Sequence, residues 1–238
     1  MSGSQKWGTK SLFHTAASAQ GKCLWTAQRR KMGFIPLLRR LSRPVPKKAS
    51  YGVSDVQYAY ILQTNETDFS FFQRICTLEG CAFLVYDGTL VLYAQSYLEG
   101  IPPAKTITIT SDGDYSFVDH SARLYGSCRI ERGLYQGNFH VDNGGTRQYV
   151  PDMDVPITIS SQAEADRYAK NLLRSVNKGM LYGYFYGRVM PEFAAASTAN
   201  IENDRATSWN GHVFFTHIRN DYGKGRSKVF FRKPLDGY

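Results

Sequence analysis

The stretch from Gln57 to Tyr93 constrains the fold most, because it has the pattern of a strand, a helix and a hairpin in immediate succession. The aromatic and β-branched run Gln57–Leu62 favours a strand. Side chains that can cap a helix N-terminus follow, namely Thr64, Asn65, Thr67 and Asp68. Apolar residues then recur at helical spacing, namely Phe71, Phe72, Ile75, Cys76 and Leu78. This spacing predicts a helix near Asn65–Leu78 with one buried face.

The end of this helix and the following turn are also marked in the sequence. Gly80 can adopt the left-handed conformation that ends a helix. The dipeptide Asp87-Gly88 favours a tight two-residue turn, which predicts a hairpin between Cys81–Tyr86 and Thr89–Tyr93. A strand, a short helix and a hairpin indicate only an α+β module and carry no evident chemistry.

The amino-acid sequence of this stretch resembles those of the late control D family, which forms the baseplate hub of contractile phage tails. That family is related to the body of type VI secretion spike proteins. Its members carry a QTNESD-type phrase, a helix of the form D-x-x-F-x-x-R-x-x-x-x-x-G, and a hairpin with DGTL at its turn. The matching residues are Gln63, Thr64, Asn65, Glu66, Asp68, Phe72, Arg74, Gly80, Asp87, Gly88, Thr89 and Leu90.

The run Thr158–Lys178 is the clearest helix in the sequence, and this second principal helix is expected near Gln162–Asn177. Ser161 and Glu164 have the spacing of a capping box, and Gly179 follows as an end signal. The apolar face consists of Ala165, Tyr168, Ala169, Leu172 and Val176.

The remaining periodic segments alternate apolar and polar residues and predict strands. They are Lys105–Thr110, Phe117–Val118, Ala122–Ile130, Tyr135–Val141, Met180–Val189, His212–Ile218 and Ser227–Arg232. The fold class that follows is β-dominated α+β with two amphipathic helices. The resemblance implies that the strands form tail-tube-like β-barrel modules with an inserted α/β hairpin unit.

The second half also resembles the hub family, in a helix of the form A-x-x-x-A-x-x-L-L-x-x-x-N and a Gly-rich strand after it. The matching residues are Ala165, Ala169, Leu172, Leu173, Gly187, His217 and Tyr222. Residues 191–207 depart from the family pattern, because they lack the Pro–Gly motif that precedes the next strand in family members. A strand in this segment is therefore in doubt. By this resemblance, the N-terminal domain of the family is expected to be missing or much reduced here. The resemblance covers about residues 25–238 and is sharp only over 57–93 and 161–187.

The net positive charge of the chain comes from its N-terminal fifth. Residues 1–50 hold 11 of the 29 Lys and Arg and none of the 20 Asp and Glu, which leaves 18 basic against 20 acidic residues beyond them. A short helix is expected there, with Phe34, Leu37, Leu38 and Leu41 on one side. An acidic partner, either nucleic acid or a neighbouring subunit, would explain the charge, and so would a solvated helix face with a linker. We favour a neighbouring subunit or a solvated helix face over nucleic acid, because no nucleic-acid motif accompanies the charge.

No metal or cofactor site is indicated. Cys23, Cys76, Cys81 and Cys128 lack metal-ligand spacing and are interpreted as buried free thiols. The histidines are scattered, namely His14, His120, His140, His212 and His217. The loop Asp142–Gly145, with Asp112 and Asp114, offers too few carboxylates for calcium and is interpreted as a turn.

Membrane segments are not expected either. The sequence has no run of about 18 apolar residues and no signal-peptide core at its start. A soluble protein made in a cytoplasm is therefore expected, and the resemblance implies that this is the cytoplasm of a host bacterium.

Three classes of function fit the sequence. The resemblance implies a structural baseplate hub, a homotrimer in the virion or in a phage-tail-like particle that joins the hexameric tail tube to the trimeric central spike. Tape-measure and baseplate wedge proteins are further expected neighbours. A nucleic-acid-binding module would use the basic N-terminus. A tail-associated cell-wall hydrolase would need carboxylates, and Glu66, Asp68 and Glu79 are the candidates, although their positions suit helix capping and helix surfaces better.

We therefore predict no enzyme and no catalytic, cofactor or metal residue. The chain divides into a basic segment with a short helix (1–50), a strand–helix–hairpin module (51–100) and a β-barrel-like hub domain (101–238) with its helix at 161–178. The strand faces of Lys105–Thr110 and Tyr182–Val189 are expected near subunit contacts.

Overall fold

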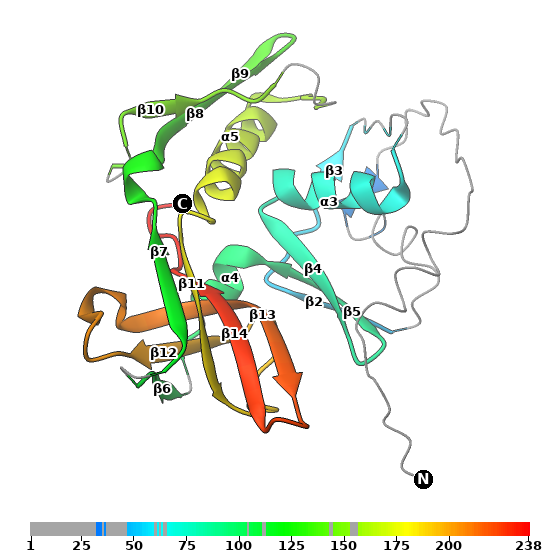
Figure 1. Cartoon of the computed structure of the whole chain (residues 1–238). Helices are drawn as coiled ribbons and strands as arrows, with labels where there is room; N and C mark the ends of the chain where they lie inside the picture. Colours follow the sequence, from blue (N-terminus) through cyan, green and yellow to red (C-terminus); the bar gives the residue numbers. More distant parts are fainter. Residues whose placement is uncertain are drawn as a thin grey trace.

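A computed structural model describes residues 32–34, 36, 47–59, 61, 63, 66–103, 105–110, 113–142, 145–152 and 157–238. These residues form a β-dominated α+β fold in three parts (Figure 1). A curled six-stranded sheet lies at one end, a three-stranded sheet with a long helix at the other, and a second three-stranded sheet with a shorter helix beside them. The expected fold class is confirmed. Apart from Phe34 and Pro36, the short helix predicted over residues 34–41 lies outside the described residues, as does most of the basic segment 1–50.

The strand–helix–hairpin module follows the sequence pattern closely. Its elements are β1 (Met32–Gly33), β2 (Lys47–Tyr51), β3 (Gln57–Tyr58), α3 (Asp68–Leu78), β4 (Cys81–Tyr86) and β5 (Thr89–Ala94). β1 pairs with β3, and β5 lies between β4 and β2, which runs parallel to it. The expected strand Gln57–Leu62 was too long, because its pairing with β1 ends at Tyr58.

Helix α3 begins at Asp68, three residues later than Asn65. The reason is its cap: the Thr67 side chain accepts a hydrogen bond from the Ser70 N–H at 3.2 Å. All five residues of the predicted apolar face are buried. The turn residues behave as expected, since Gly80, Asp87 and Gly88 have φ of 66°, 45° and 65°.

A short helix, α4 (Gln95–Glu99), directly follows β5. No helix was predicted here from the sequence. The Gln95 side chain holds the helix to the sheet by donating to the Cys81 carbonyl at 3.1 Å. Its last residue, Glu99, is almost completely buried.

The upper part in Figure 1 is a small sheet covered by helix α5 (Gln162–Asn177). The sheet order is β10 (Arg147–Tyr149), β8 (Tyr125–Arg132), β9 (Tyr135–His140), with β10 parallel to β8. Strand β10 was not predicted. Gly137 lets α5 approach β9 closely, because a Cβ there would lie 2.0 Å from the Ala165 carbonyl oxygen.

The ends of α5 differ in detail from the predicted pattern. Ser161 caps the helix by accepting from the Glu164 N–H at 3.2 Å. The Glu164 carboxylate, however, accepts from the N–H of Ser160 and not from that of Ser161. Gly179 has no left-handed φ, and Lys178 closes the last turn with its N–H on the Arg174 carbonyl.

Helix α5 also holds the C-terminal end of α3. The Asn171 side chain donates to the Leu78 carbonyl at 2.7 Å, which satisfies a carbonyl group left free at the helix end. Gly80 lies against the same Asn171 side chain. The two predicted helices therefore share one apolar core with both three-stranded sheets.

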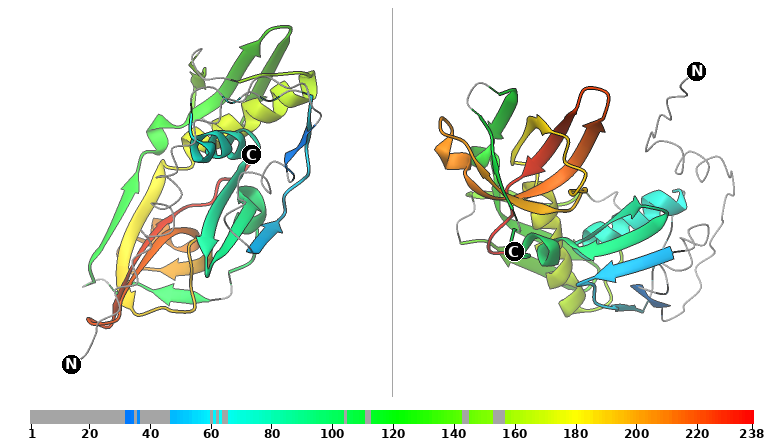
Figure 2. Two further views of the ribbon diagram at one scale, coloured as in Figure 1. Left: turned by 90° about the vertical axis from the view of Figure 1, so that its right-hand side faces the viewer. Right: turned by 90° about the horizontal axis from the view of Figure 1, so that it is seen from below.

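The six-stranded sheet has the order β6-β12-β13-β14-β11-β7. The strands are β6 (Thr106–Thr108), β7 (Tyr115–Asp119), β11 (Leu181–Arg188), β12 (Thr198–Glu202), β13 (Gly211–Asp221) and β14 (Arg226–Arg232). Single 3-10 turns precede β8 (Ser121–Arg123) and β13 (Thr207–Trp209). The views in Figure 2 show the sheet curled about its own core.

Strand β12 corrects the sequence analysis, which doubted a strand in residues 191–207. Thr198–Glu202 pairs with β13 on one side and with β6 on the other. Ala199 and Ile201 are its inward residues, and both are completely buried. The core of this sheet also contains Trp209, which stacks on Phe117 with ring centroids 5.1 Å apart.

Candidate assembly surface

The six-stranded sheet has two edge strands. β6 and β7 stand at opposite ends of the strand order, so in the described part of the chain the sheet is a half-barrel and not a closed barrel. Each edge strand pairs on one side only, β6 with β12 and β7 with β11. Such edges can accept a strand from another chain.

The backbone N–H and C=O groups of edge strand β6 face alternately toward β12 and away from it. The Asn200 N–H donates to the Lys105 carbonyl, and the Ile109 N–H donates to the Glu202 carbonyl. In a parallel pair the residues alternate in direction, so Thr106 and Thr108 turn their backbone groups away from β12. Both side chains are exposed, whereas Ile109 is buried in the sheet core.

The two segments expected at subunit contacts therefore differ in position, because one lies at an edge of the sheet and the other does not. Lys105–Thr110 contains the edge strand β6. Tyr182–Val189 contains β11, which lies one strand in from the β7 edge, between β7 and β14. The place of both segments in subunit contacts stays a prediction.

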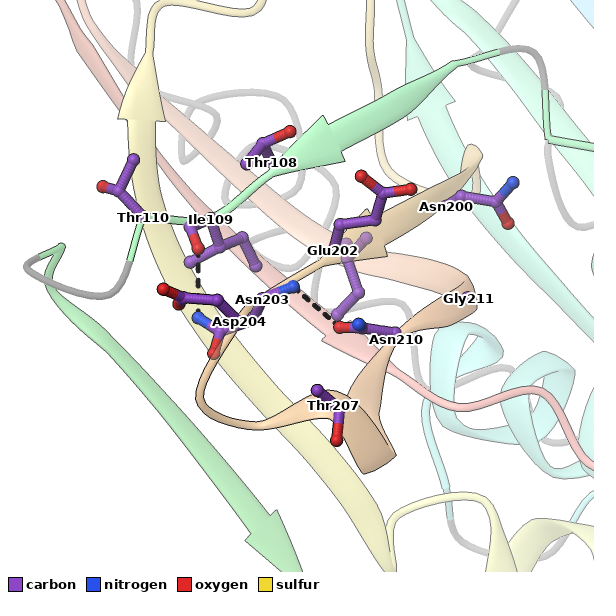
Figure 3. A pocket seen from close by; sticks show the side chains of 11 residues that line it. Thr108, Ile109, Thr110, Asn200, Glu202, Asn203, Asp204, Thr207, Asn210 and Gly211 are labelled. Atoms are coloured by element: carbon purple, nitrogen blue, oxygen red, sulfur yellow. Dashed lines mark hydrogen bonds between the residues drawn. The ribbon is translucent and has the colours of Figure 1, made fainter.

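A shallow hollow opens beside β6 and β12 (Figure 3). Its lining residues are polar or acidic apart from two isoleucines and a glycine, and none is basic: Thr108, Ile109, Thr110, Asn200, Ile201, Glu202, Asn203, Asp204, Thr207, Asn210 and Gly211. Glu202 and Asp204 supply the charge and are exposed.

Asn203 fixes the loop that borders this hollow. Its side-chain amide donates to the Ile109 carbonyl at 3.0 Å, and its side-chain oxygen accepts from the N–H groups of Arg205 and Ala206. Its own N–H donates to the Asn210 side chain at 2.7 Å (Figure 3). Because the side-chain amide, the side-chain oxygen and the backbone N–H of Asn203 are all hydrogen-bonded within the chain, this residue is a scaffold of the edge and not a free ligand.

The half-barrel is joined to the helical part through a buried carboxylate, Glu99. It accepts from Arg174 of α5 at 2.6 Å, from Arg232 of β14, and from the Leu235 N–H at 3.2 Å. Burial alone would raise the pKa of the Glu99 carboxyl, but the hydrogen bond and charge of Arg232, with the charge of Arg174, hold it below its usual value.

Sequence reasoning missed Glu99. Its partners Arg174 and Arg232 lie 75 and 133 positions away. No local pattern links these residues, so only the tertiary structure brings them together. The pKa of the neighbouring Lys178 is lowered, mainly because the side chain is largely buried and also because Arg232 and Arg174 are positively charged.

The three carboxylates considered for catalysis are all engaged by other side chains of the chain. Glu66 pairs with Arg74 at 2.5 Å, and Asp68 accepts from Gln63 at 3.0 Å. Glu79 does not lie on the helix surface as expected. It is buried, where Arg167 binds it at 2.8 Å and the Tyr58 hydroxyl donates to it at 3.0 Å.

The described cysteines are free and buried, as predicted, namely Cys76, Cys81 and Cys128. Burial raises the thiol pKa of Cys81 and Cys128 to about 12 and raises that of Cys76 further. Cys23 lies outside the described residues. In the described part of the chain no three His, Cys, Asp or Glu residues gather as metal ligands would, and no helix has the length and apolarity that crossing a membrane requires.

Solved structures of phage tail proteins share this fold. The tail protein from Neisseria meningitidis MC58 matches with a TM-score of 0.67 and 13% identity, over 89% of this chain and 69% of that one. The 43 kDa tail protein of prophage MuSo2 from Shewanella oneidensis matches with 0.59 and 11%, over 86% and 65%. A chain in the virion of a gene transfer agent matches with 0.59 and 12%, over 99% and 54%.

The chain thus spans about two thirds or less of the length of the last two proteins. No protein-family model matches the sequence, and no curated protein is similar to it. Since the identities are 11–13%, what these structures show is a tail-protein fold.

Proposed function

We propose that this chain is a structural subunit of a phage-tail baseplate hub, of the late control D type. The observation that carries the proposal is the curled half-barrel with two open edges, in a fold shared with phage tail proteins. A sheet open at both edges can join copies side by side, and repeated head-to-tail contacts of this kind close into a ring.

The partners proposed for this subunit come from its resemblance to the hub family. It forms a homotrimer on the tail axis and joins the hexameric tail tube to the trimeric central spike. Tape-measure and wedge proteins are further neighbours. Its location is the baseplate of a virion or of a phage-tail-like particle.

A catalytic role is not part of this proposal. Glu66, Asp68 and Glu79 each bind a side chain of the chain itself, whereas a general acid or base must reach a substrate. The purified protein is therefore expected to show no hydrolysis of peptidoglycan, nucleic acid or nucleotides above background.

The proposal is tested by locating the protein in an assembled particle. Averaged cryo-electron microscopy density of isolated particles, with the chain identified by an antibody or a small tag, should place three copies around the axis between tube and spike. Particles that lack the protein, or that carry it away from the axis, would contradict the hub role.

A further inference from the structure

The outer face of the half-barrel carries an ordered group of cationic and aromatic side chains. Strand register arranges them in three rows across β13, β14 and β11. The rows are His217–Phe230–Tyr184, Arg219–Lys228–Tyr186 and Asp221–Arg226–Arg188. We call these nine residues the cationic face. Their neighbours on β14, Ser227 and Val229, point the opposite way and are completely buried.

A β-bulge brings β13 into this face. The register shifts between Phe215 and His217, so Thr216 and His217 are both exposed in succession. Ile218 then packs on the sheet core, and Arg219 returns to the outer side opposite Lys228. The bulge thus places His217 and Arg219 beside the two cations of β14.

The positive charge of this face is not neutralised within the described residues. No ion pair there joins Arg188, Arg219, Arg226 or Lys228 to a carboxylate. The single acidic residue of the face, Asp221, accepts from the Lys224 N–H at 3.1 Å and serves the hairpin turn. At the other end of β14, by contrast, Arg232 is buried against Glu99.

Aromatic rings hold the central cation in place. The Lys228 ammonium lies 3.9 Å from the ring centroid of Tyr184 and 5.0 Å from those of Tyr186 and Phe230. The Arg226 guanidinium lies 4.8 Å from the ring centroid of Tyr186. These contacts position charge without neutralising it. They also cover ring faces on which nucleic-acid bases would otherwise stack.

We propose that the cationic face binds an extended acidic segment of a neighbouring protein. Arg226 and Lys228 are two residues apart on one strand, which separates them by roughly 6.6 Å along the chain direction. Alternate residues of an extended peptide have the same spacing. A segment with a carboxylate at every second position therefore meets both cations, and Arg219 and Arg188 flank them on the adjoining strands. The face would bind such a segment whether or not the chain is a hub subunit.

The test uses the full chain and a fluorescein-labelled octapeptide of alternating Glu and Thr, with binding followed by fluorescence anisotropy. Lys228→Gln should raise Kd about fivefold, and the double variant Arg226→Gln/Lys228→Gln about tenfold or more. The matched control is Lys170→Gln on α5, which also removes one exposed charge held over a ring, that of Phe139. It should leave Kd unchanged, and circular dichroism should show that all variants fold.

Higher salt should weaken the interaction, because the proposed contacts are between exposed charges. The proposal is overturned if the peptide shows no saturable binding, or if Lys170→Gln weakens binding as much as Lys228→Gln. Tighter binding of an eight-nucleotide oligothymidine than of the peptide would also overturn it, and would assign the face to single-stranded nucleic acid.

Discussion

At the scale of single residues, Glu99 connects α4, α5 and β14 through one carboxylate. Removing it leaves Arg174 and Arg232 buried without a counter-charge. Breaking a buried pair in this way typically costs 3–5 kcal/mol. We expect Glu99→Gln to lower the free energy of unfolding by about 3 kcal/mol, measured by urea denaturation at pH 7.

The same residue predicts a pH dependence. Because the folded pKa of Glu99 is depressed, the unfolded chain binds the proton more readily in the acid range. The stabilisation is complete above the ordinary carboxyl pKa of about 4.3 and is lost as pH falls through the lower folded value. Glu99→Gln should remove this contribution, so the stability difference between the two proteins should shrink on acidification. A difference independent of pH would contradict the ionised state of Glu99.

At the scale of elements, the packing of α5 on β9 depends on Gly137. Gly137→Ala would place a methyl group 2.0 Å from a backbone carbonyl oxygen, so strand or helix must move. We expect a loss of about 2 kcal/mol in the free energy of unfolding. The control is Gly179→Ala, where nothing lies within 4 Å and φ is not positive. That change should be neutral or slightly stabilising. Equal effects of the two substitutions would argue against the close approach.

Elements with local signals were predictable from the sequence. Helix α3 and the β4–β5 hairpin follow from a cap, an apolar period and the Asp87-Gly88 turn, and α5 lies close to its predicted bounds. Strands β10 and β12 were not predicted, because they are defined by their pairing partners and not by their own short sequences. β12 shows this well: only Ala199 and Ile201 point inward, and its parallel partner β6 is more than 90 residues away. The acidic hollow and the cationic face could not be predicted for the same reason, since each combines several strands.

At the scale of the whole molecule, the three parts are fixed to one another by buried polar contacts as well as by apolar packing. Arg167 of α5 binds Glu79 at the end of α3, and Arg232 of β14 binds Glu99 at the end of α4. The half-barrel is therefore connected to the rest of the molecule through contacts that include both α3 and α5. How far the segments 1–50, 51–100 and 101–238 act as separate units stays a prediction.

The edge strand β6 gives the last prediction, which concerns assembly. If copies of the chain join through this edge, the outward N–H of Thr108 donates to a strand of the next subunit. Thr108→Pro removes that donor, while the residues that bond to β12 on either side, Ile107 and Ile109, keep theirs. We expect the purified variant to be monomeric under conditions in which the wild type is trimeric, measured by native mass spectrometry or light scattering. Thr108→Val is the matched control, because it keeps the N–H and a β-branched side chain and should remain trimeric. Circular dichroism and thermal melting will show whether the monomer is folded. A folded Thr108→Pro variant that still forms trimers would exclude this edge as the contact, and the β7 edge would then be the one to test.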